Sequence, residues 1–269
     1  MGRISALTEL TSLASDDYLV VLDSSANIAK KITIANAFGI PELGWTATGE
    51  SWTYASWTSG TRIGTITVPT DATTKYKAGD RIKITQSTGG TKYGIIVKVA
   101  ATLLTVFFPS GTTLNNEAIT SPFYALSGVN PLGFDTNPDN WTMKLESNTN
   151  RSQASPTTNT WYNAESLALG IGVWDVWYEC LISATGSVNA SPYLTLSTTN
   201  NSETDAKWTL RVYAQGAVLG LSTSGRRKLV VLTSASTLYL NMKVDQASSI
   251  VQTFASNGHT VIYARCAYI

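Results

Sequence analysis

The sequence predicts an all-β protein, and three features of the chain lead to this prediction. First, apolar and polar residues alternate with a period of two in short runs such as Arg81–Thr85 (RIKIT), where Ile82 and Ile84 share one face. Second, turn-forming stretches such as Ser87–Gly90 (STGG) separate these runs. Third, strand candidates follow one another at regular spacing through residues 161–269.

Four parts of the chain are distinguished by composition. The 269 residues are enough for two domains of common size and a small additional segment. Changes at Pro41 and after Phe134 predict an attachment segment (1–44), a small antiparallel β barrel or sandwich (45–134), a linker with a polar loop (135–160) and a C-terminal jelly-roll knob (161–269).

The first part predicts a strand, a tight turn and a second strand, at Tyr18–Leu22, Asp23–Ser25 and Lys30–Ile34. A short helix at 34–38 follows and ends at Gly39. An isolated hairpin buries too little apolar surface to be stable, so a partner surface is expected to cover it. The residues expected to make that attachment are the apolar ones of this part: Leu7, Leu10, Leu13, Leu19, Val21, Ile32 and Ile34. The alternative is the first hairpin of an ordinary β domain.

The pattern of this part resembles a known family. From Ile4 to Asp23 the chain follows I-S-x-L-T-E-x-x-S-x-x-S-D-D-x-L-x-V-x-D, with K-K-I-T at 30–33. This resembles the N-terminal segment of many bacteriophage tail-fibre and related virion proteins. The resemblance implies that the segment plugs a fibre into other virion proteins.

The middle part, 45–134, carries a second resemblance. Gly79-Asp80 forms a turn before the alternating strand at Arg81–Thr85, and a strand at Leu103–Phe108 ends at Pro109. The order V-P-x-x-A-x-x-x-Y-x-x-G-D-R-I-K-I-T-Q, then Y-x-x-x-V-x-V-x-x-T-x-L-T-V, resembles a small β module that recurs in phage tail and fibre proteins. The resemblance implies a spacer or a carbohydrate-binding-like unit. The alternative is a generic small β barrel.

Residues 135–160 predict a connection. Asp135–Asp139 has the composition of a turn, and Trp141–Leu145 is a candidate strand. Ser147–Thr160 is polar and low in complexity, which predicts a long exposed loop.

The last part, 161–269, predicts a sandwich of about eight antiparallel strands. Its final run, Thr260–Ile269, extends to the last residue, and a terminal strand must be held in a sheet. Trimeric fibre heads resembling the tumour-necrosis-factor (TNF-like) jelly roll commonly end this way, which implies a homotrimer. The predicted strands are 166–170, 172–183, 193–197, 208–213, 228–233, 236–244 and 259–267.

Composition and motifs exclude several function classes. A formal net charge of +1 provides no basic field for nucleic acid, and no run of about 18 apolar residues predicts membrane insertion. No signal peptide is expected. One His and two Cys form no usual zinc site, so neither a metal nor a cofactor is expected. Cys180 and Cys266 are expected to be buried free thiols, with a disulfide between neighbouring strands as the alternative.

No catalytic residues are predicted. The chain has no nucleophile elbow, phosphate-binding loop or H-E-x-x-H pattern. Asp175 and Glu179 are four residues apart in a predicted strand, which places them on one face about 13 Å apart. This spacing does not suit a glycosidase pair.

Aromatic and polar side chains of the last part are the candidates for recognition. Trp174 and Trp177 lie in one predicted strand and are expected on opposite faces, one in the core and one toward a subunit neighbour. Loops 147–160, 198–206 and 222–228 are the expected tips. The expected receptor-contact residues are Trp161, Tyr162, Asn200, Asn201, Arg226 and Arg227.

Together these features predict a non-enzymatic bacteriophage structural protein located in the virion. We expect a trimeric short tail fibre or fibre-like appendage that contacts a host-surface glycan or protein receptor with its knob. The first alternative is a capsid or tail decoration protein without a receptor. The second is a glycan-cleaving tailspike. Such a protein is more often a long β-helix with internal repeats, and this sequence has no internal repeat.

Overall fold

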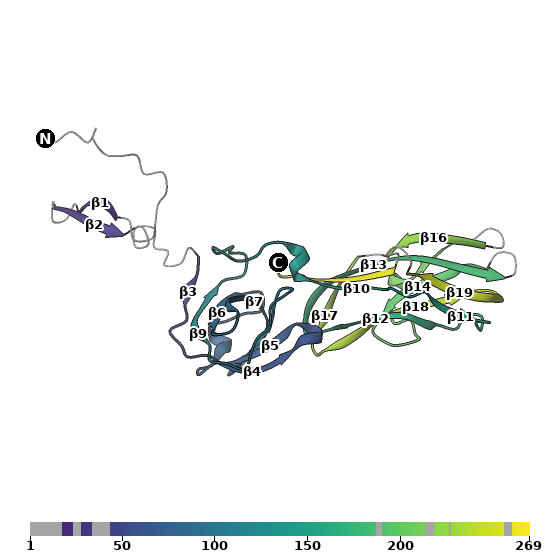
Figure 1. Ribbon diagram of the computed structural model, residues 1–269, viewed down its shortest axis with the longest axis horizontal. Helices are drawn as coiled ribbons and strands as arrows, with labels where there is room; N and C mark the ends of the chain where they lie inside the picture. Colours follow the sequence, from purple (N-terminus) through teal and green to yellow (C-terminus); the bar gives the residue numbers. More distant parts are fainter. Residues whose placement is uncertain are drawn as a thin grey trace, which may run out of the picture.

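Antiparallel β-sheets make up the computed structural model, and none of them closes into a barrel (Figure 1). The structure describes residues 18–23, 28–33, 44–186, 190–212, 218–225, 227–255 and 260–269. The predicted all-β fold class is therefore confirmed.

The predicted N-terminal hairpin is present as β1 (Tyr18–Asp23) and β2 (Ile28–Thr33). The two strands pair antiparallel, and the register places Leu19 opposite Ile32. Val21 also lies in β1. The other expected attachment residues (Leu7, Leu10, Leu13 and Ile34) and the predicted helix at 34–38 lie outside the described residues.

The middle part forms one open, curled sheet of seven strands, in the order β3-β9-β6-β7-β8-β5-β4, which we call the middle sheet. The curl brings Thr53 at one edge into a single bridge with Ala118, just before β9. Ile82 and Ile84 are fully buried on one face, as predicted, against Trp52, Ile66 and Val106. The strands are β3 (Thr46–Ala47), β4 (Thr53–Thr58), β5 (Ile63–Thr67), β6 (Arg81–Gln86), β7 (Gly90–Ala100), β8 (Leu103–Phe107) and β9 (Thr120–Ala125), with the 3-10 turns η2 (Ser59–Thr61) and η3 (Ala72–Thr74).

The stretch 135–160 is more ordered than a linker and a polar loop. It contains the 3-10 turn η4 (Pro138–Trp141), β10 (Thr142–Glu146) and β11 (Arg151–Ala154). The prediction of a loop over 147–160 is wrong at β11, because this strand pairs with β19 (Ser248–Phe254) through its backbone. Its sequence, RSQA, has no apolar alternation that would reveal it.

The C-terminal part is a sandwich of two sheets with the strand pattern of a jelly roll. The larger sheet has the order β10-β20-β13-β19-β11, with β16 and β17 also paired to the long strand β13. The smaller sheet has the order β12-β18-β14-β15. The chain passes repeatedly between the sheets, and its first strand β10 lies beside its last strand β20.

The remaining strands of this part are β12 (Tyr162–Leu169), β13 (Gly172–Gly186), β14 (Pro192–Ser197), β15 (Leu210–Arg211), β16 (Val218–Ser224), β17 (Lys228–Leu232), β18 (Ser236–Val244) and β20 (Thr260–Cys266). A strand over 208–213 was predicted, but the 3-10 turn η5 (Ala206–Trp208) takes its first residue. Asp205 caps that turn by accepting a hydrogen bond from the Lys207 N–H.

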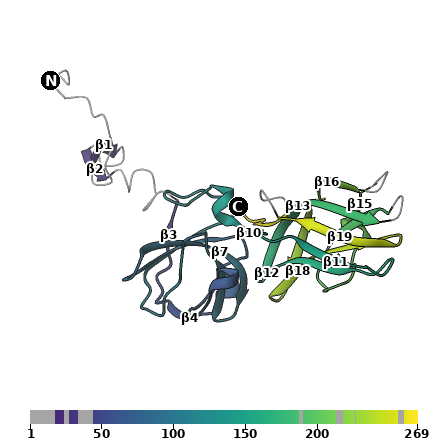
Figure 2. The same cartoon turned by 45° about the vertical axis from the view of Figure 1, so that its right-hand side comes forward.

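The sheet of the middle part and the sandwich lie next to each other (Figures 1 and 2), and one continuous hydrophobic core joins them. Phe107 of β8 meets Trp174 of β13 edge-to-face, with 4.9 Å between ring centroids. Trp141 stacks on Phe134 at 5.1 Å and also contacts Phe107. Gly170, at the end of β12, lies so close to Ile63 of β5 that a Cβ atom there would collide with it. The two parts therefore meet through a packed aromatic interface rather than through a loose connection.

Candidate functional site

The outer face of the larger sheet carries the most distinctive surface of the molecule. Register places Trp177 of β13 opposite Tyr263 of β20, and Tyr263 opposite Lys144 of β10. On the other side of β13, Asp175 lies opposite Leu229 of β17 and Val173 lies opposite Val231. We call this surface, formed by the outward residues of β10, β20, β13 and β17, the large-sheet face.

An aromatic ladder crosses this face. The rings of Trp177 and Tyr263 are parallel within 13°, with centroids 4.8 Å apart. The Arg227 guanidinium lies 5.2 Å from the Trp177 ring centroid, and the Lys144 ammonium lies 5.7 Å from that of Tyr263. The four side chains therefore follow the order Arg227, Trp177, Tyr263, Lys144, in which each aromatic ring contacts the other ring and one cation.

The charges of the large-sheet face compensate one another. Asp175 accepts hydrogen bonds from both Arg227 and Arg265. Lys144 forms an ion pair with Glu146, with 2.7 Å between Nζ and Oε2. The hydrogen bond to Glu146 raises the pKa of Lys144, and that to Asp175 raises the pKa of Arg227. These cations thus stay charged over the physiological range.

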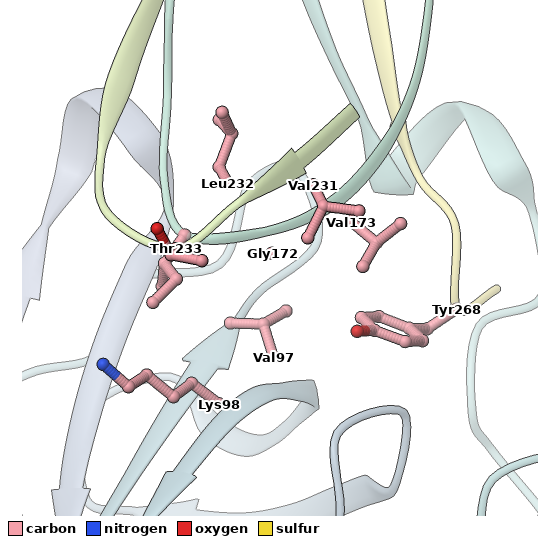
Figure 3. Close-up of a pocket in the computed structure, with 9 residues that line it drawn as sticks. Val97, Lys98, Gly172, Val173, Val231, Leu232, Thr233 and Tyr268 are labelled. Atoms are coloured by element: carbon pink, nitrogen blue, oxygen red, sulfur yellow. The ribbon is translucent and has the colours of Figure 1, made fainter. Parts of the chain in front are cut away.

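A groove of about 390 Å³ lies where the large-sheet face reaches the middle sheet (Figure 3). Its walls are mainly apolar: Val97 of β7, Ile171 and Val173 around the start of β13, Val231 of β17 and Tyr268 of the C-terminus. The Lys98 ammonium points away from Tyr268 in the close-up (Figure 3). We call this site the junction groove.

A second polar and aromatic group lies on the outer face of the smaller sheet. The Lys243 ammonium lies 4.5 Å from the Trp161 ring centroid and 5.1 Å from that of Tyr193. Arg211 lies 5.6 Å from the Tyr193 centroid and pairs with Asp245 at 2.8 Å. These five residues, which we call the far-end cluster, are next to the end of β18 that is remote from Gly170.

The predicted receptor-contact residues are divided between the two faces. Trp161 belongs to the far-end cluster, and Tyr162 follows it with its hydroxyl accepting a hydrogen bond from the Thr157 N–H. Asn201 is exposed and accepts from the Asn163 N–H at 2.6 Å, and Asn200 precedes it as an exposed residue. Arg227 lies on the large-sheet face instead. Arg226 lies outside the described residues.

The three predicted loops do not form one tip. The Asn159 N–H donates to the carbonyl of Val244, which places 155–160 at the far end. Loop 198–206 begins after Ser197, which pairs with Tyr239 near the middle of β18, and it folds over the outer face of the smaller sheet, where the Thr199 and Ser202 carbonyls accept from Asn241. Residues 222–228 lie beside the middle of β13, since Ser222 pairs with Leu181 and Lys228 with Val176. Sequence alone does not show which turns share an end.

The two tryptophans of β13 lie on opposite faces of the strand, as the alternation predicts. Trp174 is fully buried, and its Nε1 donates to the Gly170 carbonyl at 3.0 Å. Trp177 is half-buried on the opposite face. Cys180 and Cys266 are both buried free thiols, on β13 and β20, and Cys266 lies opposite Trp174 rather than opposite Cys180. The disulfide alternative is therefore excluded by register.

The enclosed carboxylates are held by donors that suit a structural role. Glu50 accepts hydrogen bonds from Lys75, Trp52 and Tyr76 at 2.7–3.0 Å. Burial alone would raise the pKa of Glu50, but these donors together lower it below its ordinary value. Glu165 accepts from Ser147 and Arg151. Each of these groups is occupied by protein partners rather than directed into a pocket.

Within the described ranges, no group of three or more His, Cys, Asp or Glu side chains is arranged to hold a metal ion. In the same residues, no helix has the length and apolar character needed to span a bilayer.

Comparison with known proteins assigns no family. No protein-family model and no curated protein match the chain. Among solved structures, it is similar to infectious bursal disease virus VP2 in a subviral particle (11% identity, TM-score 0.28, 93% of this chain and 69% of that chain). It is also similar to T=1 particles derived from infectious bursal virus (10%, 0.28, 84% and 76%) and to latent PorU of Porphyromonas gingivalis (7%, 0.27, 81% and 24%). TM-scores this low do not establish a shared fold, and they leave the function open.

Proposed function

We propose that the protein is a non-enzymatic structural component of a bacteriophage virion: a fibre-like appendage that assembles as a homotrimer. Its N-terminal segment, 1–44, attaches it to other virion proteins. Its jelly-roll knob contacts a glycan or protein on the host surface.

One observation carries this proposal. β3, the first strand after the attachment segment, and the sandwich strands β14 and β18, which carry part of the far-end cluster, lie on opposite sides of the body (Figures 1 and 2), and one continuous core joins the two parts. An appendage needs this arrangement, because one end must stay on the particle while the other reaches the cell. The N-terminal sequence pattern from Ile4 to Asp23 supports the same orientation.

The far-end cluster is the part of the knob that we assign to host contact. It presents aromatic rings together with two cations, Lys243 and Arg211. Aromatic side chains and arginine are the groups that anchor recognition surfaces most often. The cluster holds two cations and one carboxylate, Asp245, which pairs with Arg211, so the cluster favours a ligand with acidic groups.

Competition for host cells tests this function. Purified full-length protein is added to cells before infection, and adsorption of the phage is counted. We expect the wild-type protein to reduce adsorption, and we expect Lys243→Glu to block adsorption about tenfold less effectively. Lys77→Glu changes an exposed lysine in the turn before β6, far from the cluster in sequence; it is the matched control and should block like the wild type.

The outcome also separates the alternatives. If the protein is found on particles but neither binds cells nor blocks adsorption, a decoration protein without a receptor is the correct assignment. Cleavage of host polysaccharide by the purified protein would contradict the non-enzymatic assignment. If particles formed with a protein lacking residues 1–41 still contain it, the attachment role of that segment is wrong.

A further inference from the structure

We infer that the large-sheet face, continued by the junction groove, packs against a second copy of this chain. The inference rests on the proposed homotrimer and names the surface that forms it. The first observation is apolar exposure on β17: Leu229 is 57% exposed and Val231 is 66% exposed. Among the residues that the structure describes, only three other large apolar side chains are exposed: Leu126, Val129 and Leu132.

The position of β17 makes this exposure costly in a monomer. In the described part of the chain, β17 pairs with β13 on one side and with no strand on its other side. Proteins usually protect such an edge with charges, proline or a covering element, because an apolar edge invites aggregation. Here Leu229 and Val231 face outward along that edge, so a specific cover is required.

The apolar surface does not end at β17. Val231 and Val173 lie opposite each other on the face and both line the junction groove. The groove extends the surface to Val97 of the middle sheet and to Tyr268. One contiguous apolar surface therefore crosses both parts of the protein, where a second subunit lying alongside would cover it along its length.

The chemistry of the face favours a copy of itself over other occupants. The Trp177 and Tyr263 rings stack on each other, and Arg227 and Lys144 lie over them, which leaves less aromatic surface for a sugar ring to stack on. Asp175 is satisfied by two arginines, and Lys144 by Glu146. A strongly charged partner would gain little from a surface whose charges already compensate one another, whereas an uncharged patch of a neighbouring copy, a different patch from this face in a cyclic trimer, meets no repulsion.

The test compares full-length variants by sedimentation velocity at micromolar concentration. Val231→Arg and Leu229→Arg each place a charge in the inferred contact, and we expect each to weaken self-association at least roughly tenfold. Ala168→Arg is the matched control, because Ala168 is an exposed apolar residue of β12 on the opposite side of the sandwich. It should associate like the wild type. Thermal melts establish that each variant is folded, as expected for substitutions at exposed positions.

The outcomes distinguish this inference from the proposed function. A wild type that associates while Val231→Arg and Leu229→Arg associate equally well overturns the inference and leaves the homotrimer intact. A wild type that stays monomeric overturns the homotrimer itself, and the inferred surface with it. Weakening by Ala168→Arg alone would place the contact on the smaller sheet instead.

Discussion

The Arg62 guanidinium donates through Nη2 to the carbonyl oxygen of Thr142 at 2.6 Å, across a separation of 80 residues in sequence. The same side chain donates through Nη1 to the Asn140 carbonyl at 2.8 Å and lies 4.8 Å from the Phe107 ring centroid. Arg62 itself has a left-handed backbone conformation, with φ of 53°, just before β5. Arg62 thus connects the start of β5 to η4 and β10 through hydrogen bonds.

Replacing Arg62 with Ala is expected to weaken the junction between the two parts. The change leaves two carbonyl groups of η4 and β10 without their donor, and unmade hydrogen bonds of this kind cost about 1–3 kcal/mol each. We expect the free energy of unfolding, measured in urea, to fall by roughly 2–4 kcal/mol in total. Lys77→Ala removes an exposed cation in the turn before β6 and should change it by less than about 0.5 kcal/mol.

The conservative variant Arg62→Lys separates charge from geometry. Lysine keeps the positive charge but cannot reach both carbonyls with a planar fork. Burial lowers the pKa of Arg62 to about 10, so the environment does not favour the cation as such. The stability of Arg62→Lys is therefore expected to be close to that of Arg62→Ala. Full recovery by lysine would show that charge, rather than the paired hydrogen bonds, holds the junction.

Gly170 is expected to tolerate no side chain while Ile63 is present. A Cβ atom at Gly170 would meet the Cγ1 and Cδ1 atoms of Ile63, and overpacking of a well-filled core costs about 1–3 kcal/mol. In an Ile63→Ala background the space exists, so Gly170→Ala should cost much less. A double-mutant cycle in urea should give a coupling energy of about 0.5–3 kcal/mol.

Gly60 provides the control for this cycle. A Cβ atom at Gly60 meets no atom within 4 Å, and its backbone lies in the short turn η2. Gly60→Ala should be neutral or stabilise by a few tenths to about 1 kcal/mol. Equal costs for Gly170→Ala with and without Ile63 would contradict the close contact at the junction.

The sequence predicts the strands that carry their own pattern and misses those that depend on partners. Ile82 and Ile84 alternate with polar residues, and β6 is found where the alternation places it. β11 (RSQA) and β16 (VLGLSTS) have no such signal, because pairing with β19 and β13 stabilises them through the backbone. Local patterning therefore finds the strands that have their own apolar alternation and misses β11 and β16, which do not.

The candidate site shows the same limit. Alternation along β13 predicts that Trp177 faces away from Trp174, and it does. Its stacking partner Tyr263 lies 86 residues later in the chain, and only the register of β13 against β20 brings the two rings together. Phe107, Trp141 and Trp174 likewise meet in the core between β8, η4 and β13, and no local sequence pattern predicts that these three elements are in contact.

The two thiols are expected to be unreactive in the folded protein. Cys180 and Cys266 are both about 1% exposed, and burial raises the pKa of Cys180 to about 12 and that of Cys266 to about 11. Alkylation requires an exposed thiolate. Iodoacetamide at pH 8 should therefore add no mass to the native protein and two carbamidomethyl groups after denaturation without reductant. Labelling of only denatured and reduced protein would show that the two cysteines pair.

Stability is expected to fall as the pH rises above about 9, in part because of these thiols. In the unfolded chain a cysteine loses its proton near its ordinary pKa of about 8.5–9, whereas the folded protein holds it until pH 11–12. Between these values the folded state binds more protons than the unfolded state, so the free energy of unfolding decreases by up to about 1.4 kcal/mol per pH unit for each thiol. Cys180→Ala removes one such group and leaves a small cavity whose cost does not depend on pH. The stability advantage of the wild type over Cys180→Ala should therefore shrink from pH 8.5 to pH 10.5 in urea titrations, and a constant difference over that range would contradict the burial of an ionisable thiol at this position.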